Sequence, residues 1–172
     1  MIRKYLICIS FAFLMLVSFN SIAQLYKTGI GIRLGGISQG ITIKHFVNSN
    51  AALEGILSFG RHSVIITGLY EKHQPFPKAD GLSWFYGGGL HVGFISGDYS
   101  YYYFYYKSHK KVYVGDAFND SQSYVGADFI LGMEYKFKDA PIALSLDLKP
   151  FVDFVPGVYG YWEGALTFRF TL

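Results

Sequence analysis

The sequence predicts an all-β fold, an eight-stranded antiparallel up-and-down barrel. Apolar and polar residues alternate with a period of two in eight segments, and helical spacing is sustained in none of them. Aromatic residues form 19% of the 172-residue chain and charged residues 16%, against about a quarter charged in ordinary soluble domains. Few charges beside 15 Tyr, 16 Phe and 20 Gly favour a β protein with an apolar exterior.

The first two predicted strands cover residues 28–36 and 39–46 and are joined by a tight turn. Their apolar positions, separated by glycine or polar residues, are Ile30, Ile32, Leu34, Ile41 and Ile43. The third and fourth cover 51–60 and 63–72. The third sets Leu53, Leu57 and Phe59 opposite Glu54 and Ser58. Because the fourth is apolar on both sides at Val64-Ile65-Ile66, we assign its inward face from Thr67 and Glu71.

The fifth and sixth predicted strands, 82–96 and 123–138, are separated by a long polar and aromatic insert. The fifth places Leu82, Trp84, Tyr86, Leu90, Val92 and Phe94 opposite Gly87, Gly89, His91 and Gly93. The sixth places Val125, Phe129, Leu131, Met133, Tyr135 and Phe137 opposite Gly126, Asp128, Glu134 and Lys136. Both strands therefore have one apolar and one polar or glycine-rich face.

The last two predicted strands cover residues 142–150 and 159–172. The seventh alternates most regularly, with Ile142, Leu144, Leu146 and Leu148 opposite Ser145, Asp147 and Lys149. The eighth sets Trp162, Leu166, Phe168, Phe170 and Leu172 opposite Glu163, Thr167 and Arg169. A proline-containing segment separates each of these strands from the one before it.

The N-terminal segment predicts export. Arg3 and Lys4 are followed by an apolar stretch, and Ser21-Ile22-Ala23 then supplies the small residues of a cleavage site. This is the layout of a secretory signal peptide over residues 1–23. A membrane anchor is the alternative, and it is disfavoured because the apolar stretch is short and ends at small residues.

The predicted mature domain, residues 24–172, has almost balanced charge. Of the 15 basic side chains 13 stay after Arg3 and Lys4 are removed, against 12 acidic ones, so nothing suggests nucleic acid as a partner. Cys8, the only cysteine, lies in the signal peptide, so the domain has no thiol for a disulfide or a metal.

Two kinds of barrel carry such alternation, soluble barrels with an apolar interior and membrane barrels with an apolar exterior. Strands that mostly approach or exceed the roughly 9–11 residues of a membrane-spanning strand favour the second kind. The aromatic residues expected at its two membrane interfaces are Trp84, Tyr86, Tyr135, Phe137, Trp162, Phe168 and Phe170. The polar face predicts a lumen charge network of Arg33, Lys44, Glu54, Glu71, Asp128, Glu134, Lys136, Asp147, Lys149, Glu163 and Arg169.

A sheet in lipid must close, because every backbone polar group needs a partner, and eight strands enclose an interior that side chains fill. We therefore predict a plugged lumen in which inward glycines leave room for the long charged side chains opposite them. Asp147 with Lys149 and Glu134 with Lys136, two apart on one face, are the expected ion pairs. With both termini in the periplasm, the outer loops are 36–38, 60–62, 97–122 and 151–158, and the periplasmic turns are 47–50, 73–81 and 139–141.

Several local strings carry a resemblance to a known family. They are Gly31-Ile32-Arg33-Leu34-Gly35-Gly36, Leu69-Tyr70-Glu71-Lys72, Gly132-Met133-Glu134-Tyr135-Lys136 and the final Phe168-Arg169-Phe170-Thr171-Leu172. With the signal peptide, the eight alternating segments and the one long loop, the mature chain resembles the small OmpA/OmpX-type outer-membrane β-barrels, including uncharacterised members with an outer-membrane β-barrel domain.

The resemblance implies a monomer in the outer membrane of a Gram-negative bacterium, surrounded by its lipids and lipopolysaccharide. It also implies folding through the barrel-assembly machinery, which reads a C-terminal strand that usually ends in an aromatic residue. Here Phe170 lies two residues before the final Leu172. No catalytic motif is carried over by the resemblance.

The strongest candidate for contact with a partner is a tyrosine-rich segment in the long insert. Its residues are Tyr99, Tyr101, Tyr102, Tyr103, Tyr105, Tyr106, Lys110 and Lys111. Tyrosine offers a large amphipathic contact area at a low entropy cost, and lysines are suited to lipopolysaccharide phosphates. The alternative is that the flanking strands simply extend beyond the membrane, with the tyrosines at its outer interface.

Two further functions are weighed against a structural or surface-interaction barrel. A lipid A-modifying enzyme needs a His–Ser–acid set, for which His91 with Glu134 or Asp128 is the candidate, but no nucleophilic serine is evident. A narrow pore or transporter would use the inward charges as an ion path. We expect no catalysis and no cofactor. We also expect no metal, since His45, His62, His73 and His109 lack the spacing of metal ligands.

Overall fold

The computed structural model describes residues 26–60, 63–95, 99–107, 110–118, 122–155 and 158–172, and each element in these ranges is a β-strand. The strands are β1 (Thr28–Gly35), β2 (Gln39–Asn48), β3 (Ala51–Phe59), β4 (Ser63–Pro75), β5 (Leu82–Ile95), β6 (Tyr99–Lys107), β7 (Lys110–Phe118), β8 (Gln122–Lys136), β9 (Ile142–Val155) and β10 (Tyr159–Thr171). The predicted signal peptide lies outside the described residues. Within them, no helix has the length and apolar character to cross a membrane.

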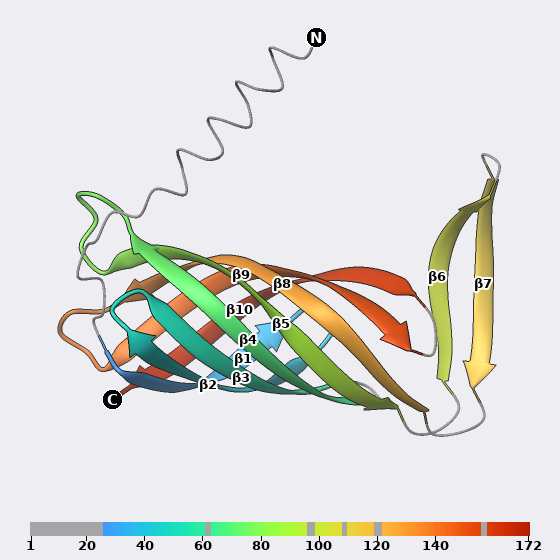
Figure 1. Cartoon of the computed structure of the whole chain (residues 1–172), viewed down its shortest axis with the longest axis horizontal. Helices are drawn as coiled ribbons and strands as arrows, with labels where there is room; N and C mark the ends of the chain where they lie inside the picture. The colour runs from blue at the N-terminus through green and yellow to red at the C-terminus, as the bar shows by residue number, and fades with distance from the viewer. Residues whose placement is uncertain (1–25, 61–62, 96–98, 108–109, 119–121, 156–157) are drawn as a thin grey trace, which may run out of the picture.

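Eight of the strands close into a barrel in the order β1-β10-β9-β8-β5-β4-β3-β2 (Figure 1). Neighbouring strands are antiparallel throughout, and the barrel closes where β1 pairs with β10. Closure provides partners for the backbone groups that an open sheet would leave at its edges. The predicted eight-stranded antiparallel barrel is therefore confirmed, and each predicted strand overlaps one strand of the barrel.

The barrel has two distinct ends. At the terminus end β1 begins and β10 finishes, and at the hairpin end β5 leaves the barrel and β8 enters it. Residues 97–122, expected as one long loop, contain β6 and β7, which form a separate two-stranded sheet. This hairpin stands beyond the barrel at the end opposite the C-terminus (Figure 1). It is not a continuation of β5 and β8, contrary to the alternative considered for the tyrosine-rich segment.

β4 and β9 run the furthest beyond their predicted ends. β4 continues to Pro75 and β9 to Val155, so the turn after β4 and the loop after β9 are shorter than expected. Proline is tolerated in β4 because it is the last residue of that strand, where its missing N–H interrupts no internal pairing. Beyond β8, Lys138 donates a hydrogen bond to Asp80 over 2.7 Å and lowers the pKa of that carboxyl.

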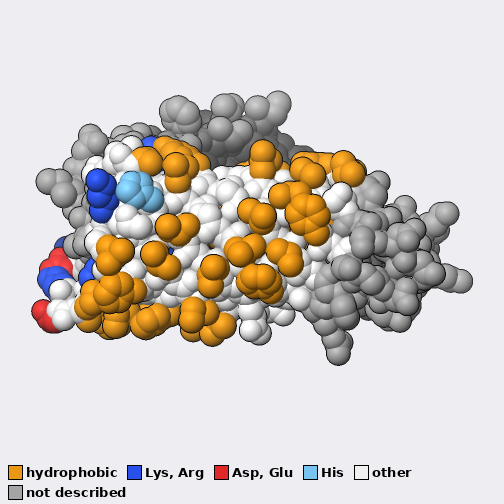
Figure 2. Space-filling view, turned by 90° about the horizontal axis from the view of Figure 1, so that it is seen from below, with side chains coloured by type: hydrophobic (Ala, Val, Ile, Leu, Met, Phe, Trp, Pro, Cys, Tyr) orange, Lys and Arg blue, Asp and Glu red, His pale blue; other side chains and the backbone are white. Residues whose placement is uncertain are grey.

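The outward face of the barrel is apolar along its length. Leu90 is 65% exposed and Phe129 69%, and their neighbours in the wall are also large hydrophobic side chains. On the face shown in Figure 2, hydrophobic side chains spread over the wall and the coloured charged side chains gather at one end. The fold thus exposes the residues that a water-soluble protein would bury.

Exposed aromatic residues lie near both ends of the wall. Of the seven aromatic residues predicted at the membrane interfaces, only Trp162 lies near the hairpin end. The other six lie toward the terminus end, where β5 begins and where β8 and β10 finish. The exposed aromatic residues near the hairpin end are Phe59, Phe94, Phe154 and Trp162.

The inward face is mainly polar but includes two small apolar clusters. Thr67 and Glu71 are buried, as predicted for the fourth strand. The clusters consist of Tyr26, Phe46, Ala52 and Ala143, and of Ile56, Leu69, Phe85 and Ile130. Strand alternation did not reveal these inward aromatic residues, because a polar lumen was expected throughout.

Candidate functional site

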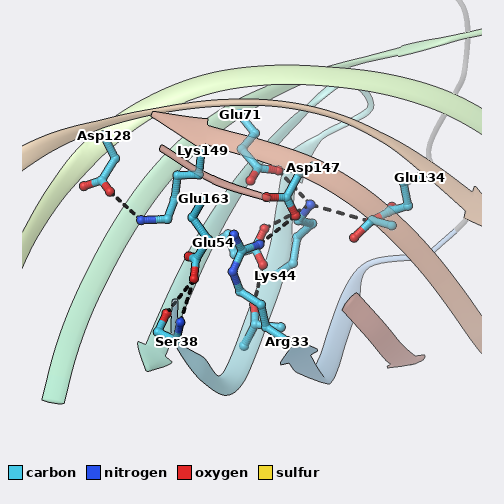
Figure 3. Close-up of polar contacts among 12 residues, drawn as sticks. Arg33, Ser38, Lys44, Glu54, Glu71, Asp128, Glu134, Asp147, Lys149 and Glu163 are labelled. Atoms are coloured by element: carbon cyan, nitrogen blue, oxygen red, sulfur yellow. Dashed lines mark hydrogen bonds and ion pairs between the residues drawn. The ribbon is translucent and has the colours of Figure 1, made fainter. Parts of the chain in front are cut away.

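The centre of the lumen contains a buried ammonium group shared by three carboxylates. Lys44 Nζ lies 2.7 Å from Glu71 Oε2, 3.0 Å from Glu54 Oε2 and 3.5 Å from Glu134 Oε2 (Figure 3). Lys44 comes from β2 and Glu134 from β8, which are four strands apart in either direction around the barrel. The charges therefore span the lumen from wall to opposite wall.

Arg169 provides the second cation of this central group. Its Nη2 pairs with Glu54, and its Nη1 donates to Glu134 Oε2 over 3.0 Å and to Ser145 Oγ over 2.7 Å. The Tyr26 hydroxyl donates to Glu134 Oε1 over 2.8 Å. Because a guanidinium carries five donors in a planar fork, it can hold several acceptors from different strands at once.

An aromatic layer lies beside these charges at the terminus end. Tyr26, Phe46, His73 and Phe85 contact one another in sequence, with ring centroids 4.8–5.1 Å apart. Lys44 Nζ lies 4.3 Å from the centroid of Phe85, a cation–π distance. His73 Nε2 also lies 3.0 Å from Glu71 Oε2, so the aromatic layer is bonded to the charged one.

A second charge group lies between the centre and the hairpin end. Arg33 Nη1 donates to Asp147 Oδ2 over 2.6 Å, and Arg33 Nη2 lies 3.7 Å from Glu163 Oε2 (Figure 3). Glu163 Oε1 in turn accepts from the Ser38 amide over 2.8 Å and the Ser38 hydroxyl over 3.1 Å. The turn after β1 is thus bonded to a lumen carboxylate.

His91 belongs to a third group near the hairpin end. Its Nδ1 lies 2.7 Å from Asp128 Oδ2 and its Nε2 lies 2.8 Å from Asp153 Oδ1. Lys149 Nζ donates to Asp128 Oδ1 over 2.8 Å. Ser38 and Ser58 line the same cavity of about 20 Å³ as His91. Both imidazole nitrogens are nevertheless bonded to carboxylates, which is not the arrangement of a base activating a serine.

Glycines across from the charged side chains make this packing possible. Seven long or charged inward residues each have a glycine as register partner on a neighbouring strand. The pairs are Arg33 with Gly40, Lys44 with Gly29, Glu71 with Gly87, His91 with Gly126, Asp128 with Gly89, Asp147 with Gly132, and Arg169 with Gly31.

The glycine positions leave no space for a side chain. A Cβ on Gly126 would lie 2.8 Å from His91 Nε2, and a Cβ on Gly132 would lie 2.8 Å from Asp147 Cβ. Both separations are shorter than ordinary carbon contacts of about 3.5–4.0 Å. At both positions a backbone carbonyl oxygen is also too close, so the opposing side chain and the neighbouring strand together require glycine.

Ten of the eleven residues of the predicted lumen charge network are buried inside the barrel. Lys136 lies apart from the other ten, and its Nζ donates to the carbonyls of Phe137 and Ala140 at the terminus end. The two ion pairs expected along single strands were wrong. Asp147 pairs with Arg33 instead, and Glu134 with Arg169 and Lys44, because side chains in a narrow barrel reach across it more readily than along one strand.

Sequence reasoning missed several members of the polar interior, among them Asp153, His73 and Tyr26. Asp153 was assigned to a loop and His73 to a turn, because β9 and β4 were ended too early. Tyr26 precedes the first predicted strand. For Asp153 the period-two continuation from Asp147 through Lys149 was the signal that could have identified it.

The predicted contact residues lie on β6 and β7, in the hairpin. Tyr101 is paired with Asp116, Tyr103 with Val114 and Tyr106 with Lys111. Among the residues that the structure describes, no group of three or more His, Cys, Asp or Glu side chains is arranged to hold a metal ion.

No protein-family model matches the chain, and no curated protein is similar to it in sequence. Among solved structures, the chain is similar to the N-terminal β-barrel domain of Pseudomonas aeruginosa OprF. The TM-score is 0.61 at 16% sequence identity, over 84% of this chain and 96% of that one. At this identity the likeness shows a shared fold. The architecture expected from the resemblance to small outer-membrane barrels is thus present, while the sequence evidence does not assign the chain to one family.

Proposed function

We propose that this protein is an outer-membrane β-barrel without catalytic activity, closed by side chains, that displays the β6–β7 hairpin at the cell surface. The observation that carries the proposal is the distribution of residues across the wall. Large hydrophobic side chains are exposed outside, while ten charged residues of the predicted network are buried inside. Water would disfavour such an exterior, and a hydrocarbon layer would favour it.

The difference between the two ends of the barrel supports one orientation in the membrane. The turns of the terminus end are short, and the only excursion with strands of its own, β6–β7, leaves from the hairpin end among the described residues. Barrels of the bacterial outer membrane have short periplasmic turns and longer extracellular loops. The terminus end therefore faces the periplasm and the hairpin end faces outward.

The hairpin provides the contact surface. Six tyrosines, Tyr99, Tyr101, Tyr102, Tyr103, Tyr105 and Tyr106, lie along β6, which pairs with β7. Lys110 and Lys111 lie at its tip, paired with Lys107 and Tyr106. A hairpin rich in tyrosine, with lysines where its two strands meet, is suited to partners that combine apolar area with phosphates, as lipopolysaccharide does.

The two other functions have less support. The carboxylates on both nitrogens of His91 argue against lipid A modification by a histidine-activated serine. Ion pairs between opposite walls, as from Lys44 to Glu134, argue against an open ion path. A structural or surface-interaction role agrees best with a lumen filled in this way.

Cell fractionation with surface labelling tests the proposal. An epitope tag inserted between residues 107 and 110 should be recognised on intact cells, and the protein should sediment with the outer membrane. A tag after residue 172 should be recognised only after the outer membrane is permeabilised. Recovery in the soluble fraction, or the reverse tag accessibility, would contradict the placement. Lipid A mass profiles with and without the gene should be identical, and a changed acylation pattern would favour the enzyme instead.

A further inference from the structure

The outward wall contains an apolar groove that crosses four strands. It has a volume of about 610 Å³, within the roughly 300–1,000 Å³ of ligand pockets. Its lining comes from β4, β5, β8 and β9 and includes Tyr70, Lys72, Tyr86, Gly88, Phe129 and Leu148. None of the buried charged residues described above lines the groove, so the groove is distinct from the plug.

A missing side chain in the wall creates the groove. Tyr70, Gly88 and Phe129 are consecutive register partners on β4, β5 and β8. Gly88 therefore leaves a gap between two aromatic rings on the outward face. A Cβ added to Gly88 would come within 3.3 Å of the Asp128 carbonyl oxygen and 4.0 Å of the Phe129 ring, so a larger side chain would fill the gap.

The groove crosses a place where the ladder between β8 and β9 is interrupted. β8 and β9 pair Asp128 with Phe151 and next Leu131 with Leu148, and the intervening residues form no register pair. Pro150, which has no backbone N–H to donate, lies in this interval and lines the groove. The groove thus includes a point where the backbone pairing of the wall is incomplete.

One cation, Lys72, lines the groove toward the terminus end of the barrel. Lys72 is the register partner of Tyr86, Tyr86 of Leu131, and Leu131 of Leu148. Lys72 lies three residues from the terminus end of β4, whereas Leu148 lies in the middle of β9. This row therefore runs from an ammonium group at the edge of the apolar wall into its centre. Lys72 Nζ also lies 5.7 Å from the centroid of the Tyr70 ring.

We propose that this groove binds one anionic phospholipid, with an acyl chain against Gly88 and the headgroup phosphate on Lys72. The inference rests on the proposed membrane placement, and it adds a specific lipid site to it. Charge complementarity selects the occupant. A lipid with an apolar acyl chain and a negative headgroup matches both the apolar groove and the ammonium group of Lys72 at its terminus end. Lipid of the periplasmic leaflet would reach Lys72 from that end.

Native mass spectrometry of the delipidated, folded barrel tests the site, with dioleoyl-phosphatidylglycerol and dioleoyl-phosphatidylethanolamine as probes. The first phosphatidylglycerol molecule to bind should do so more tightly than the first phosphatidylethanolamine molecule. Lys72→Gln should weaken that first binding about tenfold, the loss expected for one charge-assisted hydrogen bond. Gly88→Leu should weaken the first binding of both lipids, because it fills the apolar floor. Lys27→Gln, an exposed lysine at the same end, and Gly55→Leu, an outward glycine on β3, serve as matched controls.

Equal binding of the two lipids to the unchanged protein would overturn the proposal. It would also be overturned if Lys72→Gln bound phosphatidylglycerol as tightly as Lys27→Gln does, or if Gly88→Leu bound it as tightly as Gly55→Leu does. Heat-modifiable migration in vesicles is measured on the same samples. A chain that does not fold into a barrel in vesicles contradicts the membrane placement, whereas a folded barrel without lipid preference contradicts only the groove.

Discussion

Arg169 on β10 is the register partner of Gly31 on β1, and a Cβ on Gly31 would lie 2.7 Å from Arg169 Cγ. The aliphatic part of Arg169 thus lies over the glycine, while its buried guanidinium bonds to Glu54 on β3 and Glu134 on β8. This relationship explains why glycine and arginine occur together on the inward face. A narrow barrel holds long charged side chains only where its opposing positions are empty.

Gly31→Ala should therefore destabilise the barrel, because the added methyl overlaps Arg169 and the neighbouring backbone. Overpacking of this kind costs about 1–3 kcal/mol. The free energy of unfolding is measurable by urea titration in lipid vesicles, with fluorescence of the two tryptophans, Trp84 and Trp162, as the signal. Gly55→Ala is the control, since its Cβ would only touch Ile43 at 3.5 Å. Equal stability of the two variants would contradict the packing argument.

Lys44→Met should lower the free energy of unfolding by about 3–5 kcal/mol, the loss expected when one member of a buried ion group is removed. Three carboxylates that now face Lys44 would have no ammonium between them. The double variant Lys44→Met with Glu71→Gln should recover part of this loss, because it removes one of the unpaired charges. Lys138→Met, which breaks an exposed and solvent-screened pair, should cost far less than Lys44→Met. A Lys44 variant as mild as this control would show that the central charges contribute little.

His91→Phe should destabilise the hairpin end without changing lipid A. Removal of the imidazole leaves Asp128 and Asp153 without their shared donor, at a cost of about 1–3 kcal/mol. Urea unfolding measures the first effect, and mass spectrometry of lipid A from cells carrying the variant measures the second. An altered lipid A profile that depends on His91 would assign it a catalytic role and contradict its structural one.

Replacement of residues 99–118 by a short turn should leave the barrel folded. β6 and β7 pair only with each other, while β5 and β8 are paired directly from Leu82–Tyr135 to Ile95–Gln122. The shortened protein should still show heat-modifiable migration in gels and the same unfolding midpoint. Loss of heat-modifiable migration would mean that the hairpin is part of the folding unit rather than a displayed element.

The period-two pattern was sufficient to predict the barrel strands, since each face of a membrane-type wall has one chemical character. Strand ends were less predictable. Pro150 indicates the end of a strand, because it has no backbone N–H to donate. β9 nevertheless continues to Val155, because β10 and β8 pair with it there. The hairpin was also not predictable, because consecutive tyrosines give no alternation between apolar and polar residues.

The inward positions of the charged residues followed from the same alternation, but their partners did not. Sequence spacing suggested Glu134 with Lys136, whereas Glu134 bonds to Tyr26 and Arg169, which are 108 and 35 residues away. Contacts across a closed barrel depend on its diameter and on the stagger of its strands, and neither is encoded in one strand. The aromatic layer around Phe85 was missed for a related reason, since one inward phenylalanine does not disturb the pattern.

Planar-bilayer conductance of the folded protein tests the central claim, a lumen closed by its own side chains, most directly. Ion pairs cross the lumen from Lys44 to Glu134 and from Arg169 to Glu54. No continuous water path should therefore exist between the two ends of the barrel. We predict that protein shown to be inserted by heat-modifiable migration gives no stable single-channel steps in concentrated salt. Reproducible, voltage-independent steps from the unchanged protein would contradict the account.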